Sequence, residues 1–181
     1  MANVLVPLAH GFEEIEAVTI IDVLRRADIG VTVAGLTEGA IIGAHGVAIV
    51  PDVLLSTVST ESFDMIVLPG GQPGTDNLGK EQKVHQLLGE FAAEGKFICA
   101  ICAAPIVLGA AGLLQGKKAT CYPAYRDHLK GGNYLETPVV VDHRLITGSG
   151  PAAAMRFGLE LVAQLVRQQV ADDVAQALLV P

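Results

Sequence analysis

Aromatic residues are scarce in this chain of 181 residues, since tryptophan is absent and Phe, Tyr and Trp together make up 4% of it. Charged residues are also few, at 17%, against about 25% in a typical soluble domain. Apolar residues make up 51% of the chain, which is enough to offset the entropy of ordering, so we expect a folded chain. At about 100–200 residues per domain, the length predicts a single domain over residues 1–181.

Basic residues are outnumbered by acidic ones. Lys and Arg number 12 against 19 Asp and Glu, which gives a formal net charge of −7. The longest basic clusters are the pairs Arg25-Arg26 and Lys117-Lys118. Nucleic-acid phosphates are bound by a basic face, so we expect no dedicated nucleic-acid partner.

Long apolar runs and a disulfide framework are also missing. No stretch approaches about 18 uncharged apolar residues, and the N-terminus lacks the basic segment of a signal peptide, so we expect no membrane association. The three cysteines, Cys99, Cys102 and Cys121, lack the number and spacing of a disulfide framework, which predicts a reducing, cytoplasmic location. The Cys-x-x-Cys spacing has no second pair to complete a zinc site, so we expect no metal.

Apolar runs alternate with helical patterns along the chain. Near-continuous apolar strands between helices are typical of a mostly parallel α/β sheet covered on both faces, with a ligand site beyond the carboxyl ends of the strands. Gly30 stands where a C-terminal cap of the first helix is expected. The predicted strands are 4–8, 31–34, 65–68 and 97–101, the helices 13–28, 81–94, 103–113, 152–169 and 171–179, and the hairpins 40–50 and 139–147.

Cys102 lies where a predicted strand ends and a helix with Pro105 in its first turn begins. A side chain at this corner points towards the exposed amides of the helix, and these amides and the helix dipole favour a thiolate. The arrangement is that of a nucleophile elbow. A small buried hydrophobe is the alternative, and position alone leaves both open, whereas Cys99 inside the strand is expected in the core.

Two further segments carry candidate functional groups. Gly70-Gly71 follows a strand, and its N–H groups suit an oxyanion, although a tight turn alone explains such a pair. Glu13 and Glu14 are expected to complement the helix dipole. Glu16 lies at the edge of the apolar stripe, so partial burial would raise its pKa and keep it protonated, able to donate a hydrogen bond to a sulfur or to shuttle protons.

These segments together resemble the DJ-1/PfpI superfamily, most closely the DJ-1 branch that includes the bacterial ThiJ-like members. The resemblance implies a flavodoxin-like three-layer α/β sandwich that forms a homodimer, with the helix over residues 13–28 in the interface. The matching segments cover nearly the whole chain and include Gly11–Val18, Val31–Leu36, Val67–Gly71, Ala100–Pro105 and Gly148–Pro151.

The resemblance also implies a site. The reactive cysteine of the family falls on Cys102, its protonated glutamate on Glu16, and its oxyanion-type backbone donors on Gly71 and Ala103. The Thr-His-Pro-like segment of many members here reads Thr120–Pro123 and carries Tyr122 in place of histidine. Because a phenol is a poor base at neutral pH, this departure weakens a Cys-His dyad.

His10, His45 and Tyr122 are candidate pocket residues. His45 stands where close relatives often carry arginine, so it is expected either to bind an anionic substrate or an oxidised cysteine, or to lie on the surface of a hairpin tip. His10 follows the first predicted strand and could line the pocket.

The activity implied is the detoxification of reactive dicarbonyls by a cysteine nucleophile without metal or organic cofactor. Substrates would be small dicarbonyls, as in a glutathione-independent glyoxalase that makes lactate from methylglyoxal, or glycated side chains, as in a protein deglycase. The alternative is an oxidative-stress sensor or redox-regulated chaperone acting through oxidation of Cys102. A PfpI-type peptidase is disfavoured by Tyr122, and a class I glutamine amidotransferase by the lack of a late His-x-Glu pair.

Overall fold

A seven-stranded sheet in the order β10-β11-β7-β6-β1-β2-β5 forms the centre of the computed structural model, which describes residues 2–180. Neighbouring strands pair in parallel, except that β10 is antiparallel to β11. This is the mostly parallel sheet that the sequence predicts. The strands are β1 (Asn3–Leu8), β2 (Gly30–Gly35), β5 (Val53–Leu54), β6 (Met65–Leu68), β7 (Phe97–Ile101), β10 (Val139–Asp142) and β11 (Leu145–Gly148).

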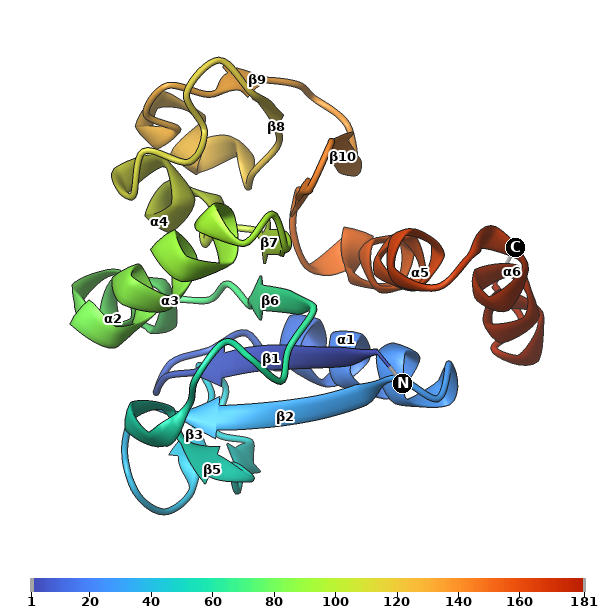
Figure 1. The fold of residues 1–181 in the computed structure, drawn as a ribbon, viewed down its shortest axis with the longest axis horizontal. Coiled ribbons are helices and arrows are strands. Elements are labelled where there is room, and N and C mark those ends of the chain that lie inside the picture. Colours follow the sequence, from blue (N-terminus) through green and yellow to red (C-terminus); the bar gives the residue numbers. More distant parts are fainter. Residues whose placement is uncertain (1, 181) are drawn as a thin grey trace.

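Helices cover both faces of the sheet, with α5 and α6 on one side and α2, α3 and α4 on the other (Figure 1). Side chains of β1 alternate between two cores, because Val4 and Val6 pack with α1 and α5 whereas Leu5 packs with α3 and α4. The helices are α1 (Glu14–Arg26), α2 (Gly74–Lys80), α3 (Gln82–Ala93), α4 (Pro105–Ala110), α5 (Ala154–Leu165) and α6 (Gln168–Ala177).

Short strands and 3-10 turns complete the connections. An antiparallel hairpin forms from β3 (Ile41–Ile42) and β4 (Ala48–Ile49), and a small parallel pair from β8 (Lys118–Ala119) and β9 (Asn133–Tyr134). The amide of Ala44 donates to the carbonyl of Phe12 at 2.8 Å, which docks the β3–β4 hairpin beside the start of α1. The 3-10 turns are Leu55–Thr57, Pro123–His128 and Pro151–Ala153.

Both predicted hairpins and the strands at 65–68 and 97–101 are confirmed, but the cap at Gly30 is wrong. Gly30 begins β2, and Asp28 takes the left-handed conformation instead, with φ 55°. The amide of Ile29 then bonds to the carbonyl of Leu24 at 3.2 Å and closes the end of the helix. The helix predicted over 152–169 is also wrong in length, because Arg167 is extended and separates α5 from α6.

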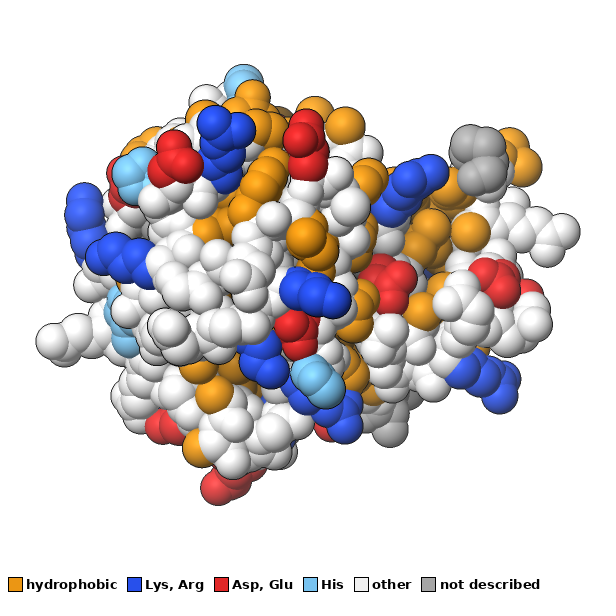
Figure 2. All heavy atoms as spheres, turned by 90° about the horizontal axis from the view of Figure 1, so that it is seen from above, with side chains coloured by type: hydrophobic (Ala, Val, Ile, Leu, Met, Phe, Trp, Pro, Cys, Tyr) orange, Lys and Arg blue, Asp and Glu red, His pale blue; other side chains and the backbone are white. Residues whose placement is uncertain are grey.

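The surface mixes residue types. Figure 2 shows one face on which Lys and Arg side chains lie among Asp and Glu side chains. Ile15 and Val18 of α1 are exposed, and the homodimer implied by the resemblance stays a prediction. Among residues 2–180, none of the helices combines the length and apolar character that a bilayer span needs.

Candidate active site

Cys102 occupies the corner between β7 and α4 and has a left-handed backbone, with φ 64°. This conformation is strained for a residue other than glycine, at a cost of about 1–3 kcal/mol. Two hydrogen bonds hold the corner, because the Cys102 amide donates to the Gly148 carbonyl at 2.9 Å and its carbonyl accepts the Tyr122 amide at 2.8 Å. The side chain is therefore fixed beyond the carboxyl end of β7, where open α/β sheets bind their ligands.

Two backbone amides, those of Gly71 and Ala103, lie beside the Cys102 sulfur and lower its pKa. Gly71 has φ 91°, and a Cβ there would lie 2.6 Å from the carbonyl carbon of Phe12, so only glycine fits. Donors arranged in this way stabilise negative charge on the sulfur or on an oxygen bonded next to it.

Glu16 projects from the first turn of α1 and is fully buried. Its Oε2 accepts the Gly70 amide at 2.8 Å, and its carboxyl interacts with the Cys102 thiol. Burial raises the pKa of Glu16 to about 7, against an ordinary value of 4.5. Around neutral pH the group therefore has accessible protonated and ionised forms, which suits it to proton transfer.

Burial of the Cys102 thiol acts against the thiolate that the sequence predicts. Burial raises the pKa of Cys102 to about 12, and the negative charge of Glu16 adds to the effect, whereas the amides of Ala103 and Gly71 lower it. The side chain is only 9% exposed, so desolvation opposes the thiolate that the amide donors favour. The Cys102 thiol and the Glu16 carboxyl thus form a coupled acid pair.

Gly70 lies between the two groups, although the sequence suggested its amide only as a donor to an oxyanion. A Cβ at this position would lie 2.6 Å from Cys102 Cβ and 2.7 Å from Glu16 Oε2. Its amide donates to Glu16, and its carbonyl accepts the Glu13 amide at 2.9 Å. Because Gly70 has no side chain, the thiol and the carboxyl can approach each other.

Gly70→Ala is expected to separate the pair. The added methyl group should destabilise the fold by about 1–3 kcal/mol and slow alkylation of Cys102 by iodoacetamide at least about tenfold, because Glu16 is displaced as proton acceptor. Urea unfolding and mass-resolved alkylation rates measure both effects. Gly89→Ala is the matched control, because a Cβ at Gly89 of α3 meets nothing within 4 Å, and it should leave alkylation unchanged while stabilising the helix by up to about 1 kcal/mol.

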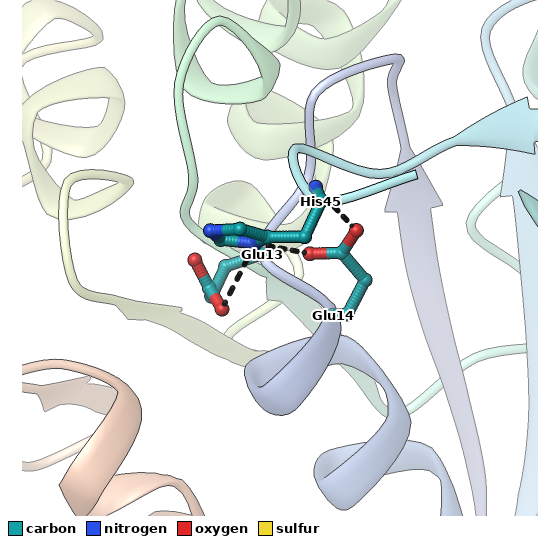
Figure 3. Close-up of side chains that lie close together, drawn as sticks. All are labelled: Glu13, Glu14 and His45. Atoms are coloured by element: carbon teal, nitrogen blue, oxygen red, sulfur yellow. Dashed lines mark hydrogen bonds and ion pairs between the residues drawn. The ribbon is translucent and has the colours of Figure 1, made fainter. Parts of the chain in front are cut away.

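His45 lies in the β3–β4 turn with its side chain 71% exposed, facing two carboxylates (Figure 3). Its Nδ1 is 2.9 Å from Glu14 Oε2 and 3.9 Å from Glu13 Oε1. The hydrogen bond that the His45 ring donates to the Glu14 carboxylate, together with the charge of Glu13, raises the pKa of His45. Glu13 and Glu14 thus face a turn residue, which their expected role as dipole partners did not include.

Tyr122 and His10 have different surroundings. Tyr122 is 45% exposed and borders a mostly apolar cavity of about 350 Å³ that Tyr134 and Pro151 also line. His10 accepts the Ile42 amide at Nδ1, at 2.9 Å, and its Nε2 lies 3.4 Å from the Thr37 hydroxyl. These contacts of His10 connect the end of β1 to the β3–β4 hairpin. The predicted residues that come together at the corner between β7 and α4 are Cys102, Glu16, Gly71 and Ala103.

A flavodoxin-like α/β sandwich with a strained cysteine beyond a parallel strand and a buried glutamate beside it defines the class of this protein. The chain belongs to the DJ-1/PfpI family, whose sequence model matches residues 2–164.

Several relatives are similar over most of the chain. Protein dj-1beta of Drosophila melanogaster is 42% identical over 181 residues, which is 98% of this chain and 97% of the relative. The glutathione-independent glyoxalase DJR-1.2 of Caenorhabditis elegans is 39% identical over 155 residues, or 84% of this chain and 82% of the relative. Protein DJ-1 homologs A and B of Arabidopsis thaliana are each 40% identical, and the chain spans 46% and 41% of their lengths.

Solved structures agree with this assignment. An oxidized DJ-1 of Toxoplasma gondii is similar at a TM-score of 0.95 and 40% identity, over 99% of this chain and 98% of that one. The sequence-based expectation of the family and of its flavodoxin-like fold is therefore confirmed.

Proposed function

We propose that this protein is a cysteine-dependent enzyme that converts reactive dicarbonyls such as methylglyoxal into hydroxy acids without glutathione. The observation that supports the proposal most is the buried pair of Cys102 and Glu16 beneath the amides of Gly71 and Ala103. A relative named as a glutathione-independent glyoxalase, 39% identical to this chain, also supports it.

The first step is addition of the thiol to the aldehyde. The Glu16 carboxylate takes the thiol proton as Cys102 sulfur bonds to the aldehyde carbon, and the carbonyl oxygen receives a proton to give a hemithioacetal. The amides of Gly71 and Ala103 stabilise the negative charge that develops on that oxygen. A raised thiol pKa is compatible with this step, because the proton needs to leave the sulfur only during the attack.

The second step moves hydrogen between neighbouring carbons. Glu16 removes the proton from the hemithioacetal carbon and returns one to the adjacent carbonyl carbon through an enediol, so the first carbon is oxidised to a thioester while the second is reduced to an alcohol. Water then cleaves the thioester, which releases the hydroxy acid and restores the thiol. The net reaction adds one water molecule, so its balance requires no external oxidant or reductant.

The same chemistry extends to early glycation adducts. A dicarbonyl bound to a Cys, Lys or Arg side chain presents a similar carbon to the sulfur, and deglycase activity would return the free side chain and the same hydroxy acid. Glyoxalase and deglycase activity therefore share Cys102 and Glu16 as proposed catalytic residues.

Incubation of the purified wild-type protein with methylglyoxal in glutathione-free buffer tests the proposal. The expected result is consumption of methylglyoxal with stoichiometric lactate, identified together with its chirality by chiral chromatography. Heat-denatured protein at the same concentration controls for scavenging by exposed amines and thiols. Methylglyoxal loss without lactate would overturn the proposal.

An oxidation sensor is the second candidate function, and the relative solved in an oxidized form favours it. Peroxide reacts with a thiolate, however, and burial raises the pKa of Cys102 to about 12, which lowers the standing thiolate population. Mass analysis after mild peroxide in the same samples separates the two functions, because selective oxygen addition at Cys102 with negligible lactate would favour the sensor.

A further inference from the structure

Three metal-ligating side chains meet at the start of α1, outside the Cys102–Glu16 pair. Glu13, Glu14 and His45 each bring one ligand atom, and these atoms all lie within 4.8 Å of one another. In Figure 3 the His45 ring lies against both carboxylates, which come from adjacent residues of one segment whereas the ring comes from the β3–β4 turn.

The charges of this cluster are unbalanced. The Glu13 and Glu14 side chains are 15% and 10% exposed, so both carboxylates are largely withdrawn from water. Among residues 2–180, His45 is the one basic group within ion-pair distance of either carboxylate. The backbone amides of His45 and Val47 stabilise the Glu14 carboxylate, but His45 can contribute at most one positive charge against two carboxylates. A divalent cation would compensate both.

Backbone hydrogen bonds fix the position of the Glu14 carboxylate. Glu14 Oε1 accepts the backbone amides of His45 at 2.6 Å and Val47 at 3.4 Å, which leaves Oε2 directed towards the ring. A Cβ at Gly43 would collide with the Glu14 carboxyl, so glycine at that position allows the turn to close over it. Supporting hydrogen bonds that fix a ligand in this way are the usual outer shell of a metal site.

We propose that Glu13, Glu14 and His45 bind a divalent first-row transition-metal ion, Zn²⁺ in the first instance. One imidazole nitrogen and two carboxylate oxygens suit zinc, with bonds of about 2.0–2.2 Å and ligand atoms about 3.4 Å apart in a tetrahedron. The 2.9 Å and 3.9 Å separations from His45 Nδ1 bracket that spacing. Three protein ligands with the ring on the solvent side leave a fourth position open.

This site is distinct from the proposed catalytic pair and does not depend on the proposed reaction. The two are connected through Gly70, whose carbonyl accepts the Glu13 amide while its own amide donates to Glu16. A thiol also binds zinc, so the test must separate the cluster from Cys102.

Isothermal titration of the full chain with ZnCl₂, carried out in a Cys102→Ser background, measures the site. We expect saturable binding of one ion per chain, with the affinity lowered at least about tenfold by either His45→Gln or Glu13→Gln. His143→Gln is the matched control, because His143 is also an exposed turn histidine, 3.7 Å from the single carboxylate of Asp142, and it should leave the affinity unchanged. Co²⁺ bound to the protein with Cys102 intact should lack a sulfur-to-metal charge-transfer band.

Each other outcome contradicts the three-ligand site. Absence of saturable binding would leave the cluster as an ion pair only. Binding that is lost with Cys102→Ser alone would assign the ion to the thiol. An affinity that falls with His45→Gln but not with Glu13→Gln would also overturn the proposal, because the second carboxylate would then take no part.

Discussion

Cys102→Ser is expected to lower lactate formation from methylglyoxal by at least about 10³-fold while the fold is retained. A serine hydroxyl fits the same corner, beside the amides of Gly71 and Ala103 that lower the pKa of the Cys102 thiol. Its proton is far more difficult to remove, and its oxygen adds to a carbonyl poorly without a strong base. Lactate production and circular dichroism of wild type and variant measure the two halves of this prediction.

Cys121→Ser is the matched control for that loss. Cys121 is buried as well, but it packs in the core opposite to that of Cys102 and donates to the Tyr122 carbonyl at 3.3 Å. A serine can keep this hydrogen bond, so turnover should stay within about twofold of wild type. Unchanged lactate production by Cys102→Ser would contradict the mechanism, and an equal loss in both variants would indicate a general effect of replacing buried sulfur.

The central strands could be predicted from the sequence because their apolar runs are buried on both faces. Met65–Leu68 and Phe97–Ile101 are buried at every position, and such runs need no partner to be recognised. The short strands could not be predicted in this way. Val53–Leu54 pairs with β2 through two residues, and so short a segment has no periodicity of its own.

The sequence predicted the members of the candidate site and the raised pKa of Glu16, but not the effect of burial on the Cys102 thiol. Cys102 and Glu16 stand out through local pattern, the one at a strand–helix corner and the other on an apolar stripe. The burial that raises the pKa of Cys102 is a tertiary property, because segments far apart in sequence meet there; Gly70 and Glu16, for example, are 54 residues apart and share a hydrogen bond. Local amide donors were visible in the sequence, and the competing desolvation was not.

The cluster around His45 shows the same limit. Its side chain meets Glu14 across 31 residues of sequence, and the contact exists only because the β3–β4 hairpin docks beside α1. Two acidic residues in a first helical turn are common for electrostatic reasons, so their pattern gave no sign of a partner in the turn.

Glu16→Gln is expected to have opposite effects on activity and stability. Loss of the proton-transfer group should reduce lactate formation by about 10²–10⁴-fold. The fold should nevertheless become more stable by about 3 kcal/mol above neutral pH, because the rise of the Glu16 pKa from 4.5 to about 7 is removed with the ionisable group. The amide oxygen of glutamine can still accept the Gly70 amide, so the local hydrogen bond is retained.

The sign of the pH dependence follows from proton binding. Between the ordinary pKa of 4.5 and the folded value of about 7, the folded protein holds a proton on Glu16 that the unfolded chain has released. The contribution of Glu16 to the stability of the wild type therefore falls as the pH rises through that window, and it is constant at higher pH. Urea unfolding of both proteins at about pH 4 and about pH 8 isolates the effect, because the other titrating groups are common to both.

The two measurements together separate a catalytic role of Glu16 from a structural one. If Glu16 served only in packing or hydrogen bonding, its replacement would destabilise the fold. The loss of activity would then follow from unfolding. If Glu16 transfers protons and its burial is unfavourable, replacing it lowers the activity but stabilises the fold. The gain in stability is then confined to pH values at which the carboxyl would be ionised. A stability difference that is independent of pH, or a wild type more stable than the variant at about pH 8, would contradict the coupled acid pair on which the proposed reaction depends.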